Sequence, residues 1–501
     1  MGAQQIPALT LQPPDSPQGP ITLHHVVATG QSLGAGYPQQ PVTLKQPFSN
    51  LMLVDSSNTY PTAGPFLSTL SLQPLVSPQR ANVGGPYPQN INGETPDIAF
   101  INQLTALSGG ALRIVGTNVA RDAADITVIN RRDGGGNSYP ASLYEAREIQ
   151  HVAGAAGLGS LCVHMVHGES DADAFNANYL AQLVEMRLDY ELDLFAILGA
   201  RALSVLPMVL NQQSQQPSSL FGPNMTGIAQ WQAAVQNPGK FILAGPRYQW
   251  PYFDGEHMLD YRPLGELSAK AFWQEYQFRT LGIGSAWAPL WPTAFSRASN
   301  VVTITFNVPV APLVWDSSNT APHLTGFLSN WSGGRGFEAW DAPQAITACT
   351  GNGVSPIVLT VADASGYTNG QTALVTGCLG NTAANGTHTI TVSGNNITLT
   401  GTTGNGTFSA GAGGAQVANM ITISATPVIS GNQVQVTLGR APTTGLVIGY
   451  GRFPDTGYGG AGGGFNFHGR CGLLRDSDTF VGLSSGIALP NWCITFEQAV
   501  A

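Results

Sequence analysis

Apolar residues follow two patterns along the chain, and the first runs from position 21 to about 292. Here short apolar runs alternate with longer segments whose apolar residues recur at helical spacing, in 176–196 and 264–278. Four short runs have the length of buried strands: residues 23–28, 111–115, 161–166 and 203–210. Strands that alternate with helices in this way predict an α/β layer fold.

The second pattern begins after about position 292, where helical spacing disappears. Short Val, Ile and Thr runs are separated by Gly and Asn turns, at 301–306, 390–392, 397–400, 421–425, 434–438 and 446–450. This predicts an all-β region, of sandwich rather than barrel type. Residues 344–416 are richer still in Gly, Thr and Asn. We therefore expect a small β module inserted into a discontinuous sandwich of residues 293–343 and 417–501.

Charged residues make up only 10% of the 501 residues, and hydrophobic residues make up 43%. So much apolar surface and so little charge argue against disorder of the whole chain. The net charge is −9, and the chain has only three lysines. No basic field is present to hold a polyphosphate backbone, which argues against nucleic acid as a partner.

No segment has the pattern of a membrane span or of an export signal. The most apolar stretch, 194–210, is interrupted by Arg201 and Pro207. Residues 1–20 form a Pro-rich arm without the basic and apolar regions of a secretory signal. We expect a soluble protein without a recognisable export signal.

The five cysteines are scattered and form no CxxC pair, which argues against a structural zinc site. By spacing, Cys349 with Cys378 and Cys471 with Cys493 are candidate disulfides, which leaves Cys162 unpaired. Spacing alone does not decide whether either bond forms.

The first candidate for chemistry is Ser32, which follows the first expected strand within Gly30-Gln31-Ser32-Leu33. An open α/β sheet places its sites at this edge, so Ser32 is a candidate nucleophile. The alternative is a helix N-cap, a position that serine favours. Residues 30–34 also match G-x-S-x-G, but the usual nucleophile elbow follows a strand deeper in the chain. An ordinary α/β-hydrolase is therefore not expected.

The second candidate is the polar segment 164–171, directly after the third expected strand. Potential metal ligands are His164, His167, Glu169, Asp171 and Asp173. In a strand, however, His164 and His167 point to opposite faces, and no second cluster completes a tetrahedral set. A polar loop is the better interpretation, and we expect no metal.

The third candidate is the pair Asp254 and His257, in a loop before the last expected helix. An aspartate and a histidine three residues apart can meet within one turn. The carboxylate then fixes the imidazole tautomer and stabilises the imidazolium that forms when His257 takes a proton from Ser32.

Together the three segments resemble the SGNH/GDSL hydrolase superfamily, and within it the carbohydrate esterases of the sialate O-acetylesterase and acetylxylan esterase type. The resemblance consists of an opening GQS block, a QGE-like third block and a closing DxxH, and covers residues 21 to about 290. It implies a flavodoxin-like three-layer α/β/α fold for an esterase domain at 21–292. It also implies ester hydrolysis through an acyl-serine without a cofactor.

Carried over to this chain, the resemblance makes Ser32 the nucleophile, His257 the general base and Asp254 its orienting carboxylate. The backbone N–H of Ser32 becomes one oxyanion donor. His167 stands where the family has a side-chain amide, and it is a second candidate donor. The family's second block corresponds to 122–126, where Ala123 is the candidate donor if its backbone suits a residue with a Cβ.

Two further assignments follow from the same comparison. Residues 135–138 are a rival for the second block, because they keep the glycines that 122–126 lacks. Glu169 is expected to be a structural hydrogen-bonding residue rather than an acid catalyst.

The β region has a looser likeness, from Ser355 to Ile390, to small β modules of phage tail and baseplate proteins. It implies a virion-associated enzyme that trims host polysaccharide, with a homo-oligomer or virion assembly as its context. The tryptophans of this region are expected mainly in the core rather than stacked on sugars: Trp315, Trp331, Trp340 and Trp492.

We therefore expect a serine esterase that removes O-acetyl or other short acyl groups from a carbohydrate. Two alternatives stay open. The first is a non-catalytic structural or adhesive glycan-binding tail protein, favoured by the missing glycines at 122–126 and by His167. The second is an esterase acting on lipids or polyesters, favoured by the apolar composition.

Overall fold

The computed structural model describes residues 21–55, 70–79, 91, 93–132, 134–153, 157–174, 176–198, 205–214, 226–250, 257–316, 334–411, 414–451 and 472–501. The Pro-rich arm at 1–20 and Asp254 therefore lie outside the described residues.

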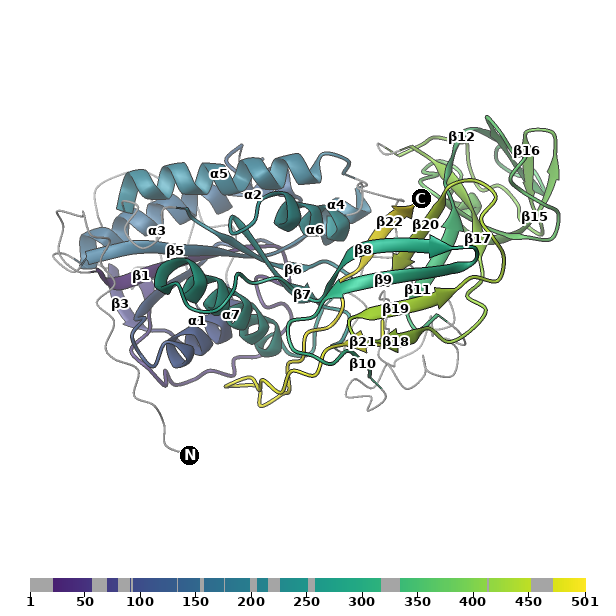
Figure 1. Ribbon diagram of the computed structural model, residues 1–501. Helices are drawn as coiled ribbons and strands as arrows, with labels where there is room; N and C mark the ends of the chain where they lie inside the picture. The colour runs from purple at the N-terminus through teal and green to yellow at the C-terminus, as the bar shows by residue number, and fades with distance from the viewer. Residues whose placement is uncertain are drawn as a thin grey trace.

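A seven-stranded sheet forms the centre of the first half of the chain, in the order β3-β2-β4-β1-β5-β6-β7 (Figure 1). All neighbours pair in parallel except β2 and β3. Its strands are β1 (Ile21–Gly30), β2 (Leu51–Asp55), β3 (Leu70–Pro74), β4 (Ile114–Asn118), β5 (Gly157–Val166), β6 (Met208–Gln212) and β7 (Phe241–Pro246). Strands β4, β6 and β7 are buried along their whole length, as expected where helices cover both faces of a parallel sheet.

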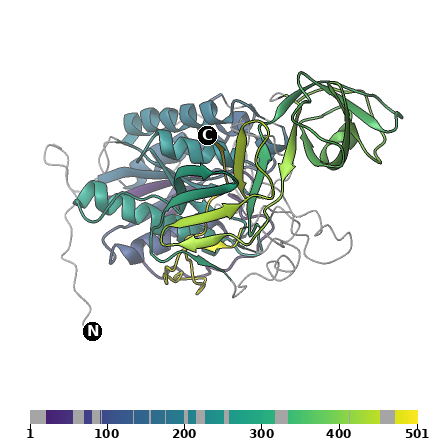
Figure 2. The same cartoon turned by 45° about the vertical axis from the view of Figure 1, so that its right-hand side comes forward.

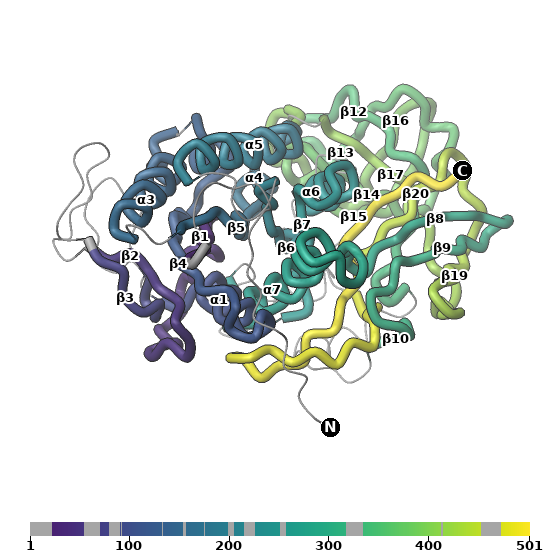
Figure 3. The backbone as a smooth tube through the Cα atoms, turned by 60° about the vertical axis from the view of Figure 1, so that its left-hand side comes forward, coloured from purple at the N-terminus to yellow at the C-terminus, as the bar shows by residue number. Residues whose placement is uncertain are grey.

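Helices cover both faces of this sheet (Figures 1 and 3). On one face lie α3 (Ser138–Ala153), α5 (Tyr179–Leu198) and α6 (Thr226–Gln236), whose apolar residues share a core with β1 and β5. On the other lie α1 (Pro96–Leu107) and α7 (Arg262–Tyr276), which is followed by a π-helical turn at Gln277–Leu281. Two short helices, α2 (Ile126–Ile129) and α4 (Glu169–Asp173), follow β4 and β5.

The predicted α/β layer is confirmed in its coarse form, and four predicted strands correspond to β1, β4, β5 and β6. Two of them start later than predicted, β4 at Ile114 and β6 at Met208. The apolar runs begin earlier because apolar composition does not mark where a sheet ladder starts. In front of β6, Pro207 has no N–H to donate to a neighbouring strand.

Two packed sheets form the core of the second half of the chain. The four-stranded sheet, in the order β18-β19-β9-β8, contains β8 (Trp291–Ala298), β9 (Val301–Asn307), β18 (Val428–Ser430) and β19 (Gln433–Thr437). It shares a core with β11 (Phe337–Asp341), β20 (Leu446–Tyr450) and β22 (Phe496–Val500), through side chains such as Ile304, Val436, Ile448 and Phe496. A two-stranded ladder joins β10 (Val314–Trp315) to β21 (Leu474–Arg475).

Residues 344–421 form a small closed barrel that projects from these sheets (Figure 2). Its strands are β12 (Gln344–Cys349), β13 (Ile357–Val361), β14 (Thr372–Thr376), β15 (Gly386–Ser393), β16 (Asn396–Leu399) and β17 (Gln416–Ile421), with a 3₁₀ turn at Thr382–Ala384. Pairing of β12 with β17 closes the ring, and the barrel has its own apolar core. The far end of β17 continues the ladder to β11.

The predictions made for the tryptophans and cysteines are confirmed only in part. Trp340 and Trp492 are buried, and Trp315 is half-buried, whereas Trp331 lies outside the described residues. Four of the cysteines are free thiols: Cys162, Cys349, Cys378 and Cys493. The candidate Cys349–Cys378 disulfide is therefore not formed, and Cys471, the other partner of Cys493, is not described.

Within the described ranges, no helix is long and apolar enough to cross a membrane.

Residues near 495 connect the β sheets to the α/β layer. The side-chain amide of Gln212, the last residue of β6, exchanges two hydrogen bonds of 2.7 Å with the backbone of Thr495. Tyr248, just after β7, donates its hydroxyl hydrogen to the carbonyl oxygen of Cys493. The carboxyl edge of the parallel sheet is thus held by residues from both halves of the chain.

Candidate active site

Ser32 lies in a tight turn at the carboxyl end of β1. Gly30 ends the strand with φ +139°, and a Cβ there would lie 2.0 Å from the carbonyl oxygen of Val166 in β5, so only glycine fits. Ala35 N–H donates to the carbonyl oxygen of Gln31, and Tyr37 N–H to that of Ser32. Ser32 is 5% exposed.

His257 reaches Ser32 from the segment that precedes α7, and its Nε2 lies 2.8 Å from Oγ of Ser32. The edge of its ring contacts the ring of Tyr37, with centroids 5.1 Å apart. In the described part of the chain, the Ser32 hydroxyl accepts no helix N–H, so the N-cap interpretation is not what the structure shows. Asp254, the predicted orienting carboxylate, is outside the described residues and stays a prediction.

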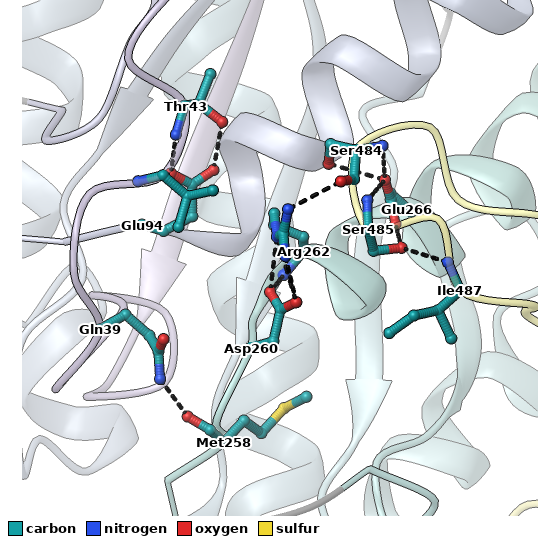
Figure 4. A network of polar contacts seen from close by, with 11 residues as sticks. Gln39, Thr43, Glu94, Met258, Asp260, Arg262, Glu266, Ser484, Ser485 and Ile487 are labelled. Atoms are coloured by element: carbon teal, nitrogen blue, oxygen red, sulfur yellow. Dashed lines mark hydrogen bonds and ion pairs between the residues drawn. The ribbon is translucent and has the colours of Figure 1, made fainter. Parts of the chain in front are cut away.

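The segment after Ser32 holds the segment after His257. Gln39 donates its side-chain N–H to the carbonyl oxygen of Met258 at 2.6 Å (Figure 4). Tyr261 accepts from the N–H of Met258 at 3.3 Å and donates its hydroxyl hydrogen to the carbonyl oxygen of Tyr37 at 2.6 Å. The loop of Ser32 and the loop of His257 are therefore bound to one another directly.

Glu94 fixes the rest of the loop that contains Ser32. Its buried carboxylate accepts from the N–H of Val42 at 3.1 Å, and from the N–H and hydroxyl of Thr43 at 2.8 and 2.6 Å (Figure 4). At Gly93 a Cβ would lie 1.9 Å from the carbonyl oxygen of Gln39, so the two segments touch backbone to backbone.

The third motif segment lies beside the first, because Gln31 binds it. The side-chain oxygen of Gln31 accepts from the N–H of Gly168 at 3.3 Å and of Ser170 at 3.2 Å. Glu169, between them, forms a fully buried ion pair with Arg247, which follows β7. The structure thus gives Glu169 a partner of opposite charge, in line with its predicted structural role.

His167 is completely buried, and both of its ring nitrogens face protein groups. Nε2 lies 3.0 Å from the carbonyl oxygen of Ala124, and Nδ1 lies 3.2 Å from the hydroxyl of Tyr179. Burial lowers the pKa of His167 to about 4, so the ring is neutral at pH 7. Because a carbonyl oxygen only accepts, Nε2 carries the hydrogen and Nδ1 accepts from Tyr179. Neither nitrogen is left for a substrate oxygen.

The segment from 122 to 126 contains a residue with a positive φ, Ala123. Ala123 has φ +51°, a left-handed conformation that a residue with a Cβ adopts only at an energetic cost, so the backbone here is not the one expected of such a residue. The side chain of Ala123 is exposed. Asp125 caps α2, and Asp171 accepts from the N–H of Ile126 at 2.8 Å. Together with the His167 bond to Ala124, these contacts hold the segment in place.

The rival placement at 135–138 packs elsewhere. A Cβ at Gly136 would lie 2.3 Å from the carbonyl oxygen of Val128 in α2. Ser138 begins α3 and is fully buried. Glycine at position 136 therefore allows the start of α3 to pack closely against α2.

The two histidines of the third segment diverge, as the strand pattern predicts. His164 stacks on Phe100 of α1, with ring centroids 4.6 Å apart, and its Nε2 lies 3.2 Å from the hydroxyl of Ser268 in α7. His167 instead faces Tyr179 of α5, on the opposite face of the sheet. Across the described ranges, no group of three or more His, Cys, Asp or Glu side chains gathers to hold a metal.

Sequence reasoning missed Tyr37, Gln39 and Tyr261 as residues of this site. The signal available for the first two is their place in the same loop as Ser32, a few positions further on. No signal in the sequence pointed to Tyr261, because a tyrosine at the start of a helix is as common in a core as in a site.

No family model matches the sequence, and no curated protein matches it. Among solved structures, the chain is similar to a carbohydrate acetylesterase from Xanthomonas citri, at 13% identity and a TM-score of 0.46, over 95% of this chain and 80% of that chain. A protein from Arabidopsis thaliana is similar at 16% identity and a TM-score of 0.35, over 50% of this chain and 98% of that chain. NanS is similar at 14% identity and a TM-score of 0.28, over 38% and 68%. These similarities are remote, and we infer no function from them.

Proposed function

We propose that this protein is a serine esterase that removes O-acetyl or other short acyl groups from a carbohydrate. One observation carries the proposal: Nε2 of His257 lies 2.8 Å from Oγ of Ser32, at the carboxyl edge of a parallel sheet. This is the distance and the location that an activated serine nucleophile needs.

In the first half of the reaction, Oγ of Ser32 bonds to the ester carbonyl carbon while its proton passes to Nε2 of His257. The carbonyl oxygen becomes an oxyanion. Its proposed donors are the backbone N–H groups of Ser32 and Ala123. Collapse of this intermediate breaks the bond to the sugar oxygen, which takes the proton from Nε2. Water then cleaves the acyl-serine by the same proton transfers and releases the carboxylic acid.

For Nε2 to accept this proton, the hydrogen of the neutral ring must be on Nδ1. Asp254 is the proposed acceptor for that hydrogen, from the order and spacing of the motif. His167 has a different role from the one that the sequence comparison assigned. Its bond to Ala124 supports the segment that carries the Ala123 N–H, which makes it a positioning residue rather than an oxyanion donor.

The substrate class rests on the motif resemblance and on the surface beside the base. The ring of Tyr37 contacts His257 and is 52% exposed, so it offers an aromatic surface next to the reacting atoms. Aromatic rings bind sugar rings without requiring a charge, which suits a neutral carbohydrate. The low charge of the chain agrees with such a substrate.

Acetate release from an acetylated polysaccharide tests the proposal. Ser32→Ala should abolish release and leave the circular dichroism spectrum and the melting temperature unchanged. Ser49→Ala, which removes an exposed hydroxyl from the same loop, is the matched control and should keep full activity. Release by Ser32→Ala at the wild-type rate would overturn the nucleophile assignment.

Two further measurements separate the alternatives. A fluorophosphonate probe should label the wild type at Ser32 and leave Ser32→Ala unlabelled, whereas an inert wild type would support a non-catalytic glycan-binding protein. A series of nitrophenyl esters should be cleaved fastest with the shortest acyl chains. A preference for long chains would instead support an esterase of lipids or polyesters.

A further inference from the structure

A segment from the second half of the chain crosses the outer side of α7, and we name residues 476–493 the strap (Figure 3, yellow). The buried carboxylate of Asp476 closes the base of the strap, since it accepts from the N–H groups of Asp478 and Asn491 at 3.1 and 2.8 Å. Lys270, in the middle of α7, donates to Asp478 at 3.0 Å and to the carbonyl oxygen of Leu489 at 2.7 Å. Both legs of the strap are therefore attached to the helix that follows His257.

The tip of the strap is bound by a buried carboxylate, that of Glu266 in the second turn of α7 (Figure 4). Glu266 accepts from the N–H and hydroxyl of Ser484 at 2.5 and 2.9 Å. It also accepts from the N–H of Ser485 at 3.0 Å and from the Ser485 hydroxyl. A fully buried carboxylate needs such donors to remain charged, so tip and helix hold one another strongly.

Gly482, at the start of this tip, lies directly against the carboxylate of Glu266. A Cβ on Gly482 would lie 2.0 Å from the carboxylate of Glu266 and 2.4 Å from the hydroxyl of Ser485. The adjacent Leu483 N–H donates to the side chain of Gln103 in α1 at 2.8 Å. The tip is thus fitted to α1 and α7 together.

The tip is connected through Arg262, the first residue of α7, to the segment that contains His257 and Asp260. Arg262 donates to the carbonyl oxygen of Ser484 at 2.8 Å. It also binds Asp260 with two donors, Nε at 3.0 Å and Nη2 at 2.8 Å (Figure 4). Asp260 is three positions after His257 in the sequence. A chain of contacts therefore leads from the strap to the loop that carries the base.

We propose that the strap tip is a positioning element for His257: Ser484 and Ser485, held by Glu266, fix Arg262 and Asp260, and so set where the imidazole meets Ser32. The catalytic part of this statement rests on the proposed function, whereas the placement of the imidazole does not. The β half of the chain is then part of the catalytic apparatus rather than only an anchor. A displacement of about 1 Å in a reacting group can lower a rate about 100-fold, so the support of a base matters for turnover.

Four full-length variants test the proposal. Gly482→Ala places a methyl group against the Glu266 carboxylate and the Ser485 hydroxyl, so their contact must shift, and Ser484→Ala removes one donor. Ser484→Thr keeps the hydroxyl and has room for its methyl group, because Ser484 is exposed. Thr479→Ala removes an exposed hydroxyl from the same strap and is the matched control.

We expect kcat for a short acetyl ester to fall 10- to 100-fold in Gly482→Ala and 3- to 10-fold in Ser484→Ala, with KM changed less than twofold. Ser484→Thr should restore kcat, and Thr479→Ala should not alter it. The acid limb of the kcat–pH profile should shift in the first two variants only. Rates measured well below each melting temperature that equal the wild-type rate would overturn the proposal, as would a change in KM alone.

Nuclear magnetic resonance of ¹³C-labelled histidines separates this proposal from the proposed function. The His257 signal, assigned with His257→Asn, should move in Gly482→Ala and stay in place in Thr479→Ala. If the wild type cleaves no ester and the signal still moves, the function fails and the strap still positions the imidazole. If the signal stays in place in Gly482→Ala, the strap proposal fails whatever the activity.

Discussion

The hydroxyl of Tyr261 donates to the carbonyl oxygen of Tyr37 at 2.6 Å and accepts from the N–H of Met258. One buried phenol thus joins the loop that follows Ser32 to the residue that follows His257. Because its partners lie on both loops, Tyr261 controls how far apart they are.

Tyr261→Phe should therefore lower kcat about 10-fold and the free energy of unfolding by about 1–3 kcal/mol, since it leaves a carbonyl oxygen and an N–H without their partner. Steady-state kinetics and urea unfolding measure the two effects. Tyr276→Phe, at the other end of α7, is the control and should leave kcat unchanged. Equal losses of kcat in both variants would show that α7 responds as a whole, and the specific link would be wrong.

The left-handed backbone of Ala123 gives a second prediction. An L residue at φ +51° is strained by about 1 kcal/mol, and glycine is not. We expect Ala123→Gly to keep activity and to raise the free energy of unfolding by up to about 1 kcal/mol. Ala123→Val should lower both, because a β-branched residue tolerates this conformation least. Urea unfolding and acetate release provide the measurements, and a stable, fully active valine variant would contradict the proposed donor.

Buried titratable groups make the fold sensitive to acid. Burial lowers the pKa of His24, His164 and His167 to about 4 and of His25 to about 3. The unfolded chain binds protons at these four sites below about pH 6.5, whereas the folded chain does not, so stability falls as the pH falls from about 6.5 to 4.

Two aspartates oppose this trend without reversing it. Burial raises the pKa of Asp97 and Asp171 to about 6, so between about pH 6 and 4 the folded chain binds protons there first. The unfolded chain then binds a net excess of about two protons, and stability should fall by about 2–3 kcal/mol per pH unit in this window. Urea unfolding at pH 7, 6 and 5 measures the slope, and equal stability at pH 7 and 5 would contradict the prediction. Asp97→Asn should make the slope steeper.

The ion pair of Glu169 and Arg247 gives a fourth prediction. Both side chains are fully buried, so Arg247→Met alone leaves a buried charge and should lower the free energy of unfolding by about 3–5 kcal/mol. The double variant Glu169→Gln/Arg247→Met should recover most of that loss. If Glu169 is structural, the double variant also retains kcat within a few-fold. A double variant that is stable but inactive would instead make Glu169 part of the chemistry.

The sequence predicted the α/β layer because strands buried on both faces, such as β5, are long apolar runs. It did not predict β2, β3 or β7, which are only five or six residues long, and β3 is an antiparallel edge strand. The Gly, Thr and Asn content of 344–416 predicted a small β module. It did not predict a closed ring, because closure depends on β12 pairing with β17, far along the chain.

At the site, the sequence identified Ser32 and His257 by motif, and their contact is observed at 2.8 Å. Their roles, and that of Asp254, stay predictions. That His167 uses both ring nitrogens inside the protein could not be predicted, because a histidine in a polar segment has the same sequence context whether it faces solvent or a carbonyl oxygen. The strap was equally hidden, since Glu266 and Ser484 are 218 positions apart.

The exchange of hydrogen bonds between Gln212 and Thr495 spans 283 positions, and translation proceeds from the N-terminus. A ribosome that has produced the whole parallel sheet has still not made the partner that Gln212 binds, nor the serines that Glu266 holds. The nascent chain therefore contains Ser32 early, whereas the contacts that surround His257 and Gln212 are completed only once residues up to 495 have emerged.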